Sequence, residues 1–232
     1  IVKDGPGSMH MSNNGNSLTG VWVKRGLLTT DQTGAVGGGA LQIGDTNGSA
    51  NATVYFVRGG NNTSIVVNGN NTGAATLQIY GPWGFTTAGT ITLGSGVGAP
   101  HDLLIEGVGG AGTPIYNGNI SGYGNLILNG NATLTLTQTS IDHAGSINVL
   151  GTGAAISAAI GPNVTGVTNS STSLTLSGTN AYTSSTTLLA GTLTLNYATQ
   201  NNSKLADGAA LVLGAGTLTL GGGSHTETVG ST

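Results

Sequence analysis

The chain has 232 residues but no cysteine, only 6% charged residues and only 4% aromatic residues. The absence of cysteine excludes a disulfide framework and any thiolate metal site. Five lysines and arginines stand against eight acidic residues, which excludes the basic surface of a nucleic-acid-binding protein. No apolar run approaches the roughly 18 residues of a membrane-spanning helix. The polar surface must therefore come from Asn, Thr, Ser and the 43 glycines.

Helical patterns are also missing. Lys, Glu and Arg are scarce, and no long window has apolar residues at the i, i+3, i+4 spacing of an amphipathic helix. Short runs of alternating apolar and polar residues occur instead, a pattern typical of strands with one buried face. Examples are Leu77-Gln78-Ile79, Ile147-Asn148-Val149, Ser173-Leu174-Thr175-Leu176 and Thr192-Leu193-Thr194-Leu195. The sequence predicts an all-β protein.

The strands are separated by Asn–Gly turns such as Asn68-Gly69-Asn70 and Asn129-Gly130-Asn131. Both residue types tolerate positive φ, so they suit the tight corners of a solenoid whose coils stack along an axis. Asn–Gly is also the strongest two-residue hairpin signal. A parallel β-solenoid is therefore the preferred prediction, and an antiparallel β-sandwich is the alternative.

Two segments, 1–30 and 172–197, repeat the same order of features. Each has a strand, a bridge that begins with Asn, and a second strand that begins with Gly. They resemble the autotransporter-associated β-strand repeat of bacterial surface proteins. The matching residues are Lys3, Gly5, Gly7, Asn16, Thr19 and Gly20 in the first copy, and Gly178, Asn180, Tyr182, Thr183, Gly191, Thr192 and Leu193 in the second.

The first copy departs from the repeat at Met9 and Met11, which replace leucines, and at Leu18, which replaces a tyrosine. The second copy lacks the Lys-x-Gly-x-Gly lead before Ser173. The resemblance implies a right-handed parallel β-solenoid and a secreted protein. We expect one solenoid domain over residues 1–232, as a mature product or a segment of a longer chain.

Two groups of side chains are candidates for carbohydrate chemistry. Asp102 and Glu106 are four residues apart on a predicted strand, which places them roughly 13 Å apart and too far for a glycosidase pair. Arg58, His101 and His143 recur at nearly equal intervals, with Asp102 and Asp142 beside the two histidines. On coils of equal length they would line one face, as in a carbohydrate-binding or carbohydrate-cleaving β-helix.

Motifs for metals and phosphates are weak. Gly44-Asp45-Thr46-Asn47-Gly48-Ser49 resembles a calcium loop but offers one carboxylate, so a turn is the better interpretation. The glycine-rich string 107–112 is followed by no helix that could hold a phosphate. We therefore predict no catalytic, cofactor-binding or metal-binding residue.

Two further features concern surfaces. Threonine runs at 133–137 and 192–194 would suit an ice-binding ladder, but Gln78, Asn148 and Val212 are expected to interrupt it. Tyr80, Trp83 and Phe85 concentrate aromatic rings and could stack on a sugar or contact a protein.

Neither end of the chain resembles a charged capping element, and an uncovered coil favours the addition of another. Identical ends that join head to tail generate an open filament. The prediction is a non-enzymatic extracellular structural protein of the bacterial cell surface, which stacks on itself end to end in a fibre or an adhesin-like stalk. Surface glycans are a further candidate partner.

Overall fold

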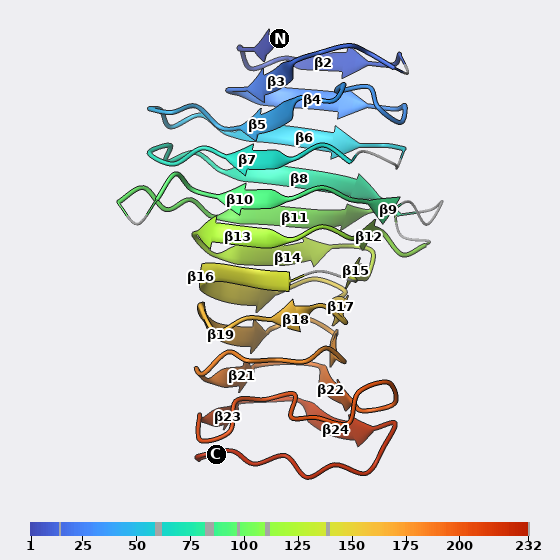
Figure 1. Ribbon diagram of the computed structural model, residues 1–232, viewed down its shortest axis with the longest axis vertical. Coiled ribbons are helices and arrows are strands. Elements are labelled where there is room, and N and C mark those ends of the chain that lie inside the picture. Colours follow the sequence, from blue (N-terminus) through green and yellow to red (C-terminus); the bar gives the residue numbers. More distant parts are fainter. Residues whose placement is uncertain are drawn as a thin grey trace.

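The computed structural model describes residues 1–13, 15–58, 62–81, 86–96, 98–109, 112–137 and 140–231. These residues form strands and no helix, stacked as a β-solenoid of about 10 turns. Figure 1 shows the coils following one another from the N-terminus at one end to the C-terminus at the other. In the described part of the chain, no helix is long and apolar enough to cross a bilayer.

Three sheets run along the stack. The first contains β1 (Val2–Lys3), β3 (Gly20–Val23), β5 (Ala40–Ile43), β7 (Ile65–Val67), β10 (Ile91–Leu93), β13 (Ile120–Tyr123), the first half of β16 (Ser140–Val149) and β18 (Ala159–Ile160). The second contains β2 (Ser8–Met11), β4 (Gly26–Thr30), β6 (Ala52–Phe56), β8 (Ala75–Tyr80), β11 (Leu103–Val108), β14 (Leu126–Gly130), the second half of β16, β19 (Val164–Asn169), β21 (Thr186–Leu188) and β23 (Leu211–Leu213). The third contains β9 (Thr86–Thr87), β12 (Ile115–Tyr116), β15 (Leu134–Leu136), β17 (Ala154–Ile156), β20 (Ser173–Leu176), β22 (Thr192–Asn196) and β24 (Thr217–Gly221).

Every pairing between these strands is parallel. The predicted parallel solenoid is thus confirmed, and the antiparallel sandwich is wrong. The Asn–Gly turns form corners rather than hairpins. Asn70 has φ 62°. Gly130 has φ 125°, and its Cα lies so close to the preceding coil that a Cβ would be 2.0 Å from the Gly107 carbonyl oxygen.

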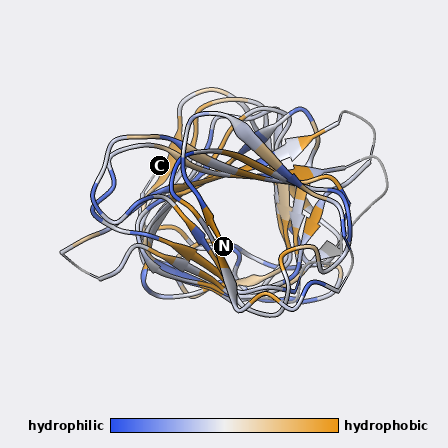
Figure 2. Cartoon of the chain, turned by 90° about the horizontal axis from the view of Figure 1, so that it is seen from above, coloured by the Kyte–Doolittle hydropathy of each residue, from blue (hydrophilic) through white to orange (hydrophobic). Residues whose placement is uncertain are grey.

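The core consists of columns of aliphatic side chains, one from each coil. One column of the second sheet contains Leu28, Val54, Leu77, Ile105, Leu128 and Val149, all fully buried. Removal of each such side chain from water contributes roughly 1.5–3 kcal/mol. Figure 2 shows the coils superimposed around a common axis, with hydrophobic residues along the strands that enclose it.

The two repeat segments each form one coil plus the strand stacked on it. Ser8 of β2 pairs with Leu27 of β4, and Ser173 of β20 pairs with Thr192 of β22, so the register is the same. The copies lie on different sheets, the second and the third. Leu18 packs against the core where the second copy has the buried Tyr182, so the substitution keeps an inward apolar residue.

Coil length changes along the axis. In the coils between β5 and β12, residues stacked on each other are up to 29 residues apart in sequence, as Thr86 and Ile115 are. From β14 to β22 the separation is 19 to 21 residues. Among the described residues of these coils, 44–51 between β5 and β6 form a loop that projects sideways from the stack in Figure 1.

Candidate functional site

The histidines of the predicted constellation lie at the corner between the first and second sheets. His101 precedes β11, and its Nδ1 lies 2.8 Å from the Asp102 carbonyl oxygen. The Nδ1 of His143, on β16, lies 2.9 Å from the Gly124 carbonyl oxygen. A carbonyl only accepts, so both rings carry the proton on Nδ1 and donate it.

His143 is fully buried and points into the core. Through Gly122, its position continues the column that contains Ile43, Val67 and Leu93. Its Nε2 has no hydrogen-bond partner. Burial lowers the pKa of His143, although the Gly124 hydrogen bond and the charges of Asp142 and Asp102 act in the opposite direction. A neutral imidazole therefore replaces an aliphatic side chain.

The carboxylates beside the histidines face outward and hold successive coils together. Asp102 accepts the backbone N–H of Asn125 at 2.7 Å, and Asp142 accepts that of Asn163 at 2.9 Å. Each also accepts a bond from the same asparagine's side chain. Such side-chain bonds satisfy corner N–H groups that strand pairing does not reach. The two acids thus have a structural role at the corner.

Asp102 and Glu106 are bound to different neighbours. Glu106 accepts a hydrogen bond of 2.9 Å from Nε2 of Gln78 on β8, whereas Asp102 is bound to Asn125 on the other side of β11. The structure therefore offers no pair of free carboxylates on this strand to flank a scissile bond.

Arg58 does not meet the two histidines. It is exposed and follows the end of β6, whereas His101 precedes the start of β11. Because both strands run the same way in the second sheet, Arg58 and His101 lie at its opposite ends. The predicted common face for Arg58, His101 and His143 is wrong, since coils of unequal length place equal sequence intervals at different positions.

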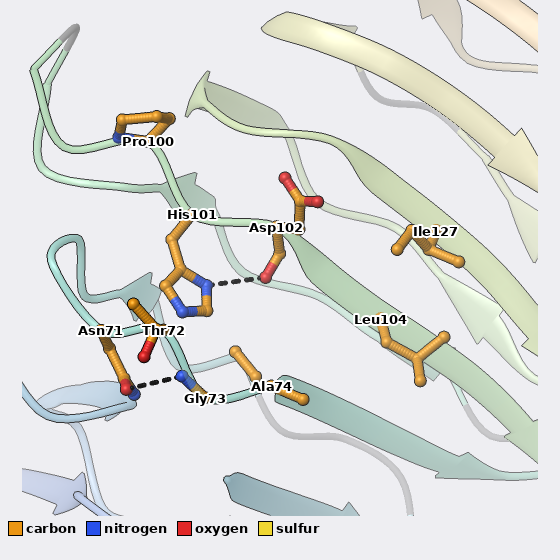
Figure 3. Close-up of a pocket in the computed structure, with 10 residues that line it drawn as sticks. Asn71, Thr72, Gly73, Ala74, Pro100, His101, Asp102, Leu104 and Ile127 are labelled. Atoms are coloured by element: carbon orange, nitrogen blue, oxygen red, sulfur yellow. Dashed lines mark hydrogen bonds between the residues drawn. The ribbon is translucent and has the colours of Figure 1, made fainter. Parts of the chain in front are cut away.

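A hollow of about 520 Å³ lies at the corner occupied by His101. Figure 3 shows the His101 ring directed toward Thr72 and Gly73, with Leu104 and Ile127 along the neighbouring strands. The lining residues are Asn71, Thr72, Gly73, Ala74, Ala75, Pro100, His101, Asp102, Leu104 and Ile127. Asp142 lines a separate hollow with Tyr123 and Asn163. Neither hollow contains an arginine beside its acidic residue, as the predicted carbohydrate-cleaving site would require.

The remaining motifs have structural explanations. Asp45 accepts the N–H of Thr46 at 2.8 Å and pairs with Lys24, and chiefly the Thr46 bond lowers the pKa of Asp45. The glycine string begins with Gly107 and Val108 at the end of β11, and its residues 110 and 111 lie outside the described residues. Within the described ranges, no three His, Cys, Asp or Glu side chains gather as a metal site needs.

The aromatic and threonine features divide between two sheets. Tyr80 lies on the second sheet, while Trp83 and Phe85 fall outside the described residues. A threonine column runs along the third sheet, and Ala155 interrupts it. Its members are Thr135, Thr175, Thr194 and Thr219. The predicted interruptions at Gln78, Asn148 and Val212 lie on the second sheet, so that part of the prediction is wrong.

Sequence reasoning missed a polar cluster near the C-terminus. Lys204 is fully buried, and its Nζ donates to the carbonyl oxygens of Ser177, Gly178 and Gln200 and to Oδ1 of Asn202. Glu227 accepts the hydroxyl of Tyr197 at 2.7 Å and the backbone N–H of Leu205 at 3.3 Å.

Segment 222–231 also belongs to the folded stack. Val229 packs against the core, and Ser231 forms a parallel bridge with Ala210. No local pattern marks these contacts, because Lys204 and Glu227 lie in Gly-, Ser- and Asn-rich surroundings.

The fold, a parallel β-solenoid with asparagine side chains at its corners, fits the passenger type of bacterial autotransporters. No family model matches the chain, and no solved structure gives a significant match. The chain is similar to the BmaC autotransporter adhesin of Brucella suis biovar 1 (strain 1330), with 31% identity over 151 residues. The match covers 65% of this chain and 4% of that adhesin, so the chain spans a small part of its length. The resemblance seen in the repeats is confirmed.

Proposed function

We propose that the chain is a shaft segment of a secreted bacterial surface adhesin, displayed outside the cell and without catalytic activity. The observation that carries this proposal is the unbroken stack of parallel coils around aliphatic columns, in a chain similar to an autotransporter adhesin. Each coil contacts mainly its neighbours, so the stack makes a long rod from short repeats. A rod of this kind holds binding surfaces away from the membrane.

The chemistry of the polar groups supports a structural role. Asp102 and Asp142 hold asparagines of the next coil, and Arg58 lies apart from both histidines. A catalytic acid or base must reach a substrate proton and carry a suitable pKa. The outward acids here are already occupied by coil-to-coil hydrogen bonds.

The proposal is tested by expressing the full parent gene in its natural host and probing intact cells with an antibody against residues 1–232. Surface labelling that protease treatment of intact cells removes, together with rod-shaped particles of the purified chain in electron micrographs, is the expected result. Labelling only after cell lysis, or a globular particle, would contradict it.

We also propose that copies of the chain stack end to end, with one copy adding its first coil to the last coil of another. Leu213 and Leu220 belong to inward-facing columns yet are 52% and 54% exposed, because segment 222–231 covers this end of the stack only in part. At the other end, Ile1 and Val2 are 53% and 57% exposed. A parallel strand laid on β24 and on the part of β23 that follows Leu211, whose N–H already donates to Ser231, would satisfy backbone groups and bury these leucines. This supports head-to-tail stacking of copies.

Sedimentation of the purified chain over a range of concentrations tests the stacking. We expect self-association that Leu220→Lys abolishes, because a charge cannot be buried in the contact. Thr187→Lys, on the outer face of the second sheet, is the matched control and should associate normally. A wild-type chain that stays monomeric at high concentration would refute stacking between copies.

A further inference from the structure

The register of the second sheet brings outward side chains of four strands onto one surface. Tyr55 of β6 pairs with Gln78 of β8, and Gln78 pairs with Glu106 of β11. Tyr80 follows Gln78 on the same side of β8. A neighbouring column carries Leu104 of β11 and Ile127 of β14. We call this surface the tyrosine face, which consists of Tyr55, Gln78, Tyr80, Leu104, Glu106 and Ile127.

The aromatic rings of this face differ from most others in the chain. Tyr55 and Tyr80 are half-buried, with ring centroids 6.5 Å apart and planes at 76°. Among the other described aromatic residues, Phe56, Tyr116, Tyr182 and Tyr197 belong to the core. A tyrosine that is fixed by an edge-to-face partner but still open to solvent presents an apolar ring beside a polar hydroxyl. This is the chemistry that packs against the C–H faces of a sugar.

Polar groups lie next to the rings. Gln78 and Glu106 are joined by a hydrogen bond of 2.9 Å and retain further donor and acceptor positions for hydroxyl groups. On the described outward positions of β6, β8, β11 and β14 there is no lysine or arginine. The one carboxylate, Glu106, would repel an acidic polysaccharide. The charge of the face therefore favours a neutral ligand.

The tyrosine face continues into the hollow beside His101. Leu104 and Ile127 belong to both, and Figure 3 shows them on adjacent strands next to Asp102. The strands are about 4.8 Å apart, which is close to the length of one sugar ring in an extended glycan. A polymer lying along the axis would thus place successive rings over successive coils, with room for a side branch in the hollow.

From these observations we propose that the tyrosine face binds a neutral polysaccharide, with Tyr55 and Tyr80 against the sugar rings and Gln78 and Glu106 bound to their hydroxyls. The inference rests on the proposed adhesive function and gives it a ligand class. It revives the carbohydrate-binding alternative on the tyrosine face, which adjoins the hollow beside His101 but includes neither Arg58 nor Asp142.

Affinity electrophoresis of the purified chain in gels that contain a neutral β-glucan, mannan or galactan tests the proposal. We expect retardation by at least one of them, and Tyr80→Ala or Tyr55→Ala should weaken binding about tenfold through loss of ring contact. Tyr80→Phe keeps the ring and should retain most of the affinity. Glu106→Gln should weaken binding less than the loss of a ring. The polysaccharide that retards the chain identifies which of these glycan types the tyrosine face binds.

Thr187→Ala, an outward position on β21, is the matched control and should bind as the wild type does. A circular dichroism spectrum with unchanged strand content shows that each variant is folded. Equal binding by Tyr55→Ala, Tyr80→Ala and wild type would overturn the proposal. Retardation only by an acidic polysaccharide, or by no polysaccharide, would also overturn it. Binding only to a deglycosylated matrix protein would do the same. Because the assay uses purified chain, its failure is separate from a failure of surface display.

Discussion

The coils from β5 to β12 and the coils from β14 to β22 have the same interior but different perimeters. In the first region, Gln78 and Glu106 are stacked although they are 28 residues apart, and Thr90 and Ser64 are 26 apart. In the second, Asp142 and Asn163 are 21 apart, and Thr152 and Thr172 are 20 apart. Leu93 and Leu176, one from each region, are equally buried. The inward columns fix the stack, while the corners are free to lengthen.

The candidate binding features follow this difference. The tyrosine face and the hollow beside His101 lie mainly in the region with long corners, where loops make the surface uneven. The region with short corners has the threonine column and regular asparagine corners. Loops on a rigid scaffold are where proteins usually place binding groups.

The largest expected effect comes from matched two-residue deletions in the two regions. Deletion of Thr152 and Gly153 removes a tight corner in which Thr152 donates to the Gly130 carbonyl and Gly153 is pressed against Ser173. It should destabilise the chain by about 4 kcal/mol or more. Deletion of the exposed Thr46 and Asn47 should cost less than about 1 kcal/mol. Urea unfolding measures both, and equal costs would remove the distinction between the regions.

Truncation of one core leucine in each region should have similar effects. Leu93→Ala in β10 and Leu176→Ala in β20 each remove a fully buried side chain, so each should cost about 2 to 5 kcal/mol. Hydrogen exchange would locate the loss around the altered coil, because coils depend on their neighbours. A cost below about 1 kcal/mol for Leu93→Ala alone would show that the wide coils are loosely packed.

A smaller effect is expected for Lys204→Met, which removes the donor shared by three backbone carbonyls and Asn202. Carbonyls left unpaired in the interior should cost about 2 kcal/mol. The control is Lys24→Met, which removes a partly exposed ion pair with Asp45 and should cost about 0 to 1 kcal/mol. Thermal unfolding of both variants makes the comparison. An unchanged midpoint for Lys204→Met would contradict the role of its ammonium group.

The smallest expected effect concerns His143 and pH. Burial lowers the pKa of His143 in the fold, despite the nearby Asp102 and Asp142. The unfolded chain therefore takes up the proton first on acidification. The stability contributed by neutral His143 is present above a pH of about 6.5 and is lost as the pH falls from there toward the lowered pKa.

Urea unfolding midpoints of the wild type should accordingly fall between neutral pH and mildly acidic pH more than those of His143→Leu. His10→Gln, at an exposed position paired with Asp31, is the control and should keep the wild-type response at His143. Identical pH profiles for the wild type and His143→Leu would refute a buried neutral imidazole.

Much of the fold could be predicted from local patterns. Alternation predicted the buried positions Leu174, Leu176, Leu193 and Leu195, and the two repeat segments predicted a parallel solenoid. The candidate sites could not be predicted as well. Arg58 and His101 were expected on one face because equal intervals in the sequence were assumed to give equal positions on successive coils. No sequence pattern indicated that Tyr55 and Gln78 are neighbours.

The sequence by itself determined which side chains face inward, because a period of two divides each strand between core and surface whatever lies beside it. It also determined where the corners lie, since positive φ at positions such as Gly130 suits glycine. Only the tertiary structure decided which outward residues meet. Adjacent strands come from different coils, and the number of residues in the corners between them sets their register. That register decides which outward side chains become neighbours.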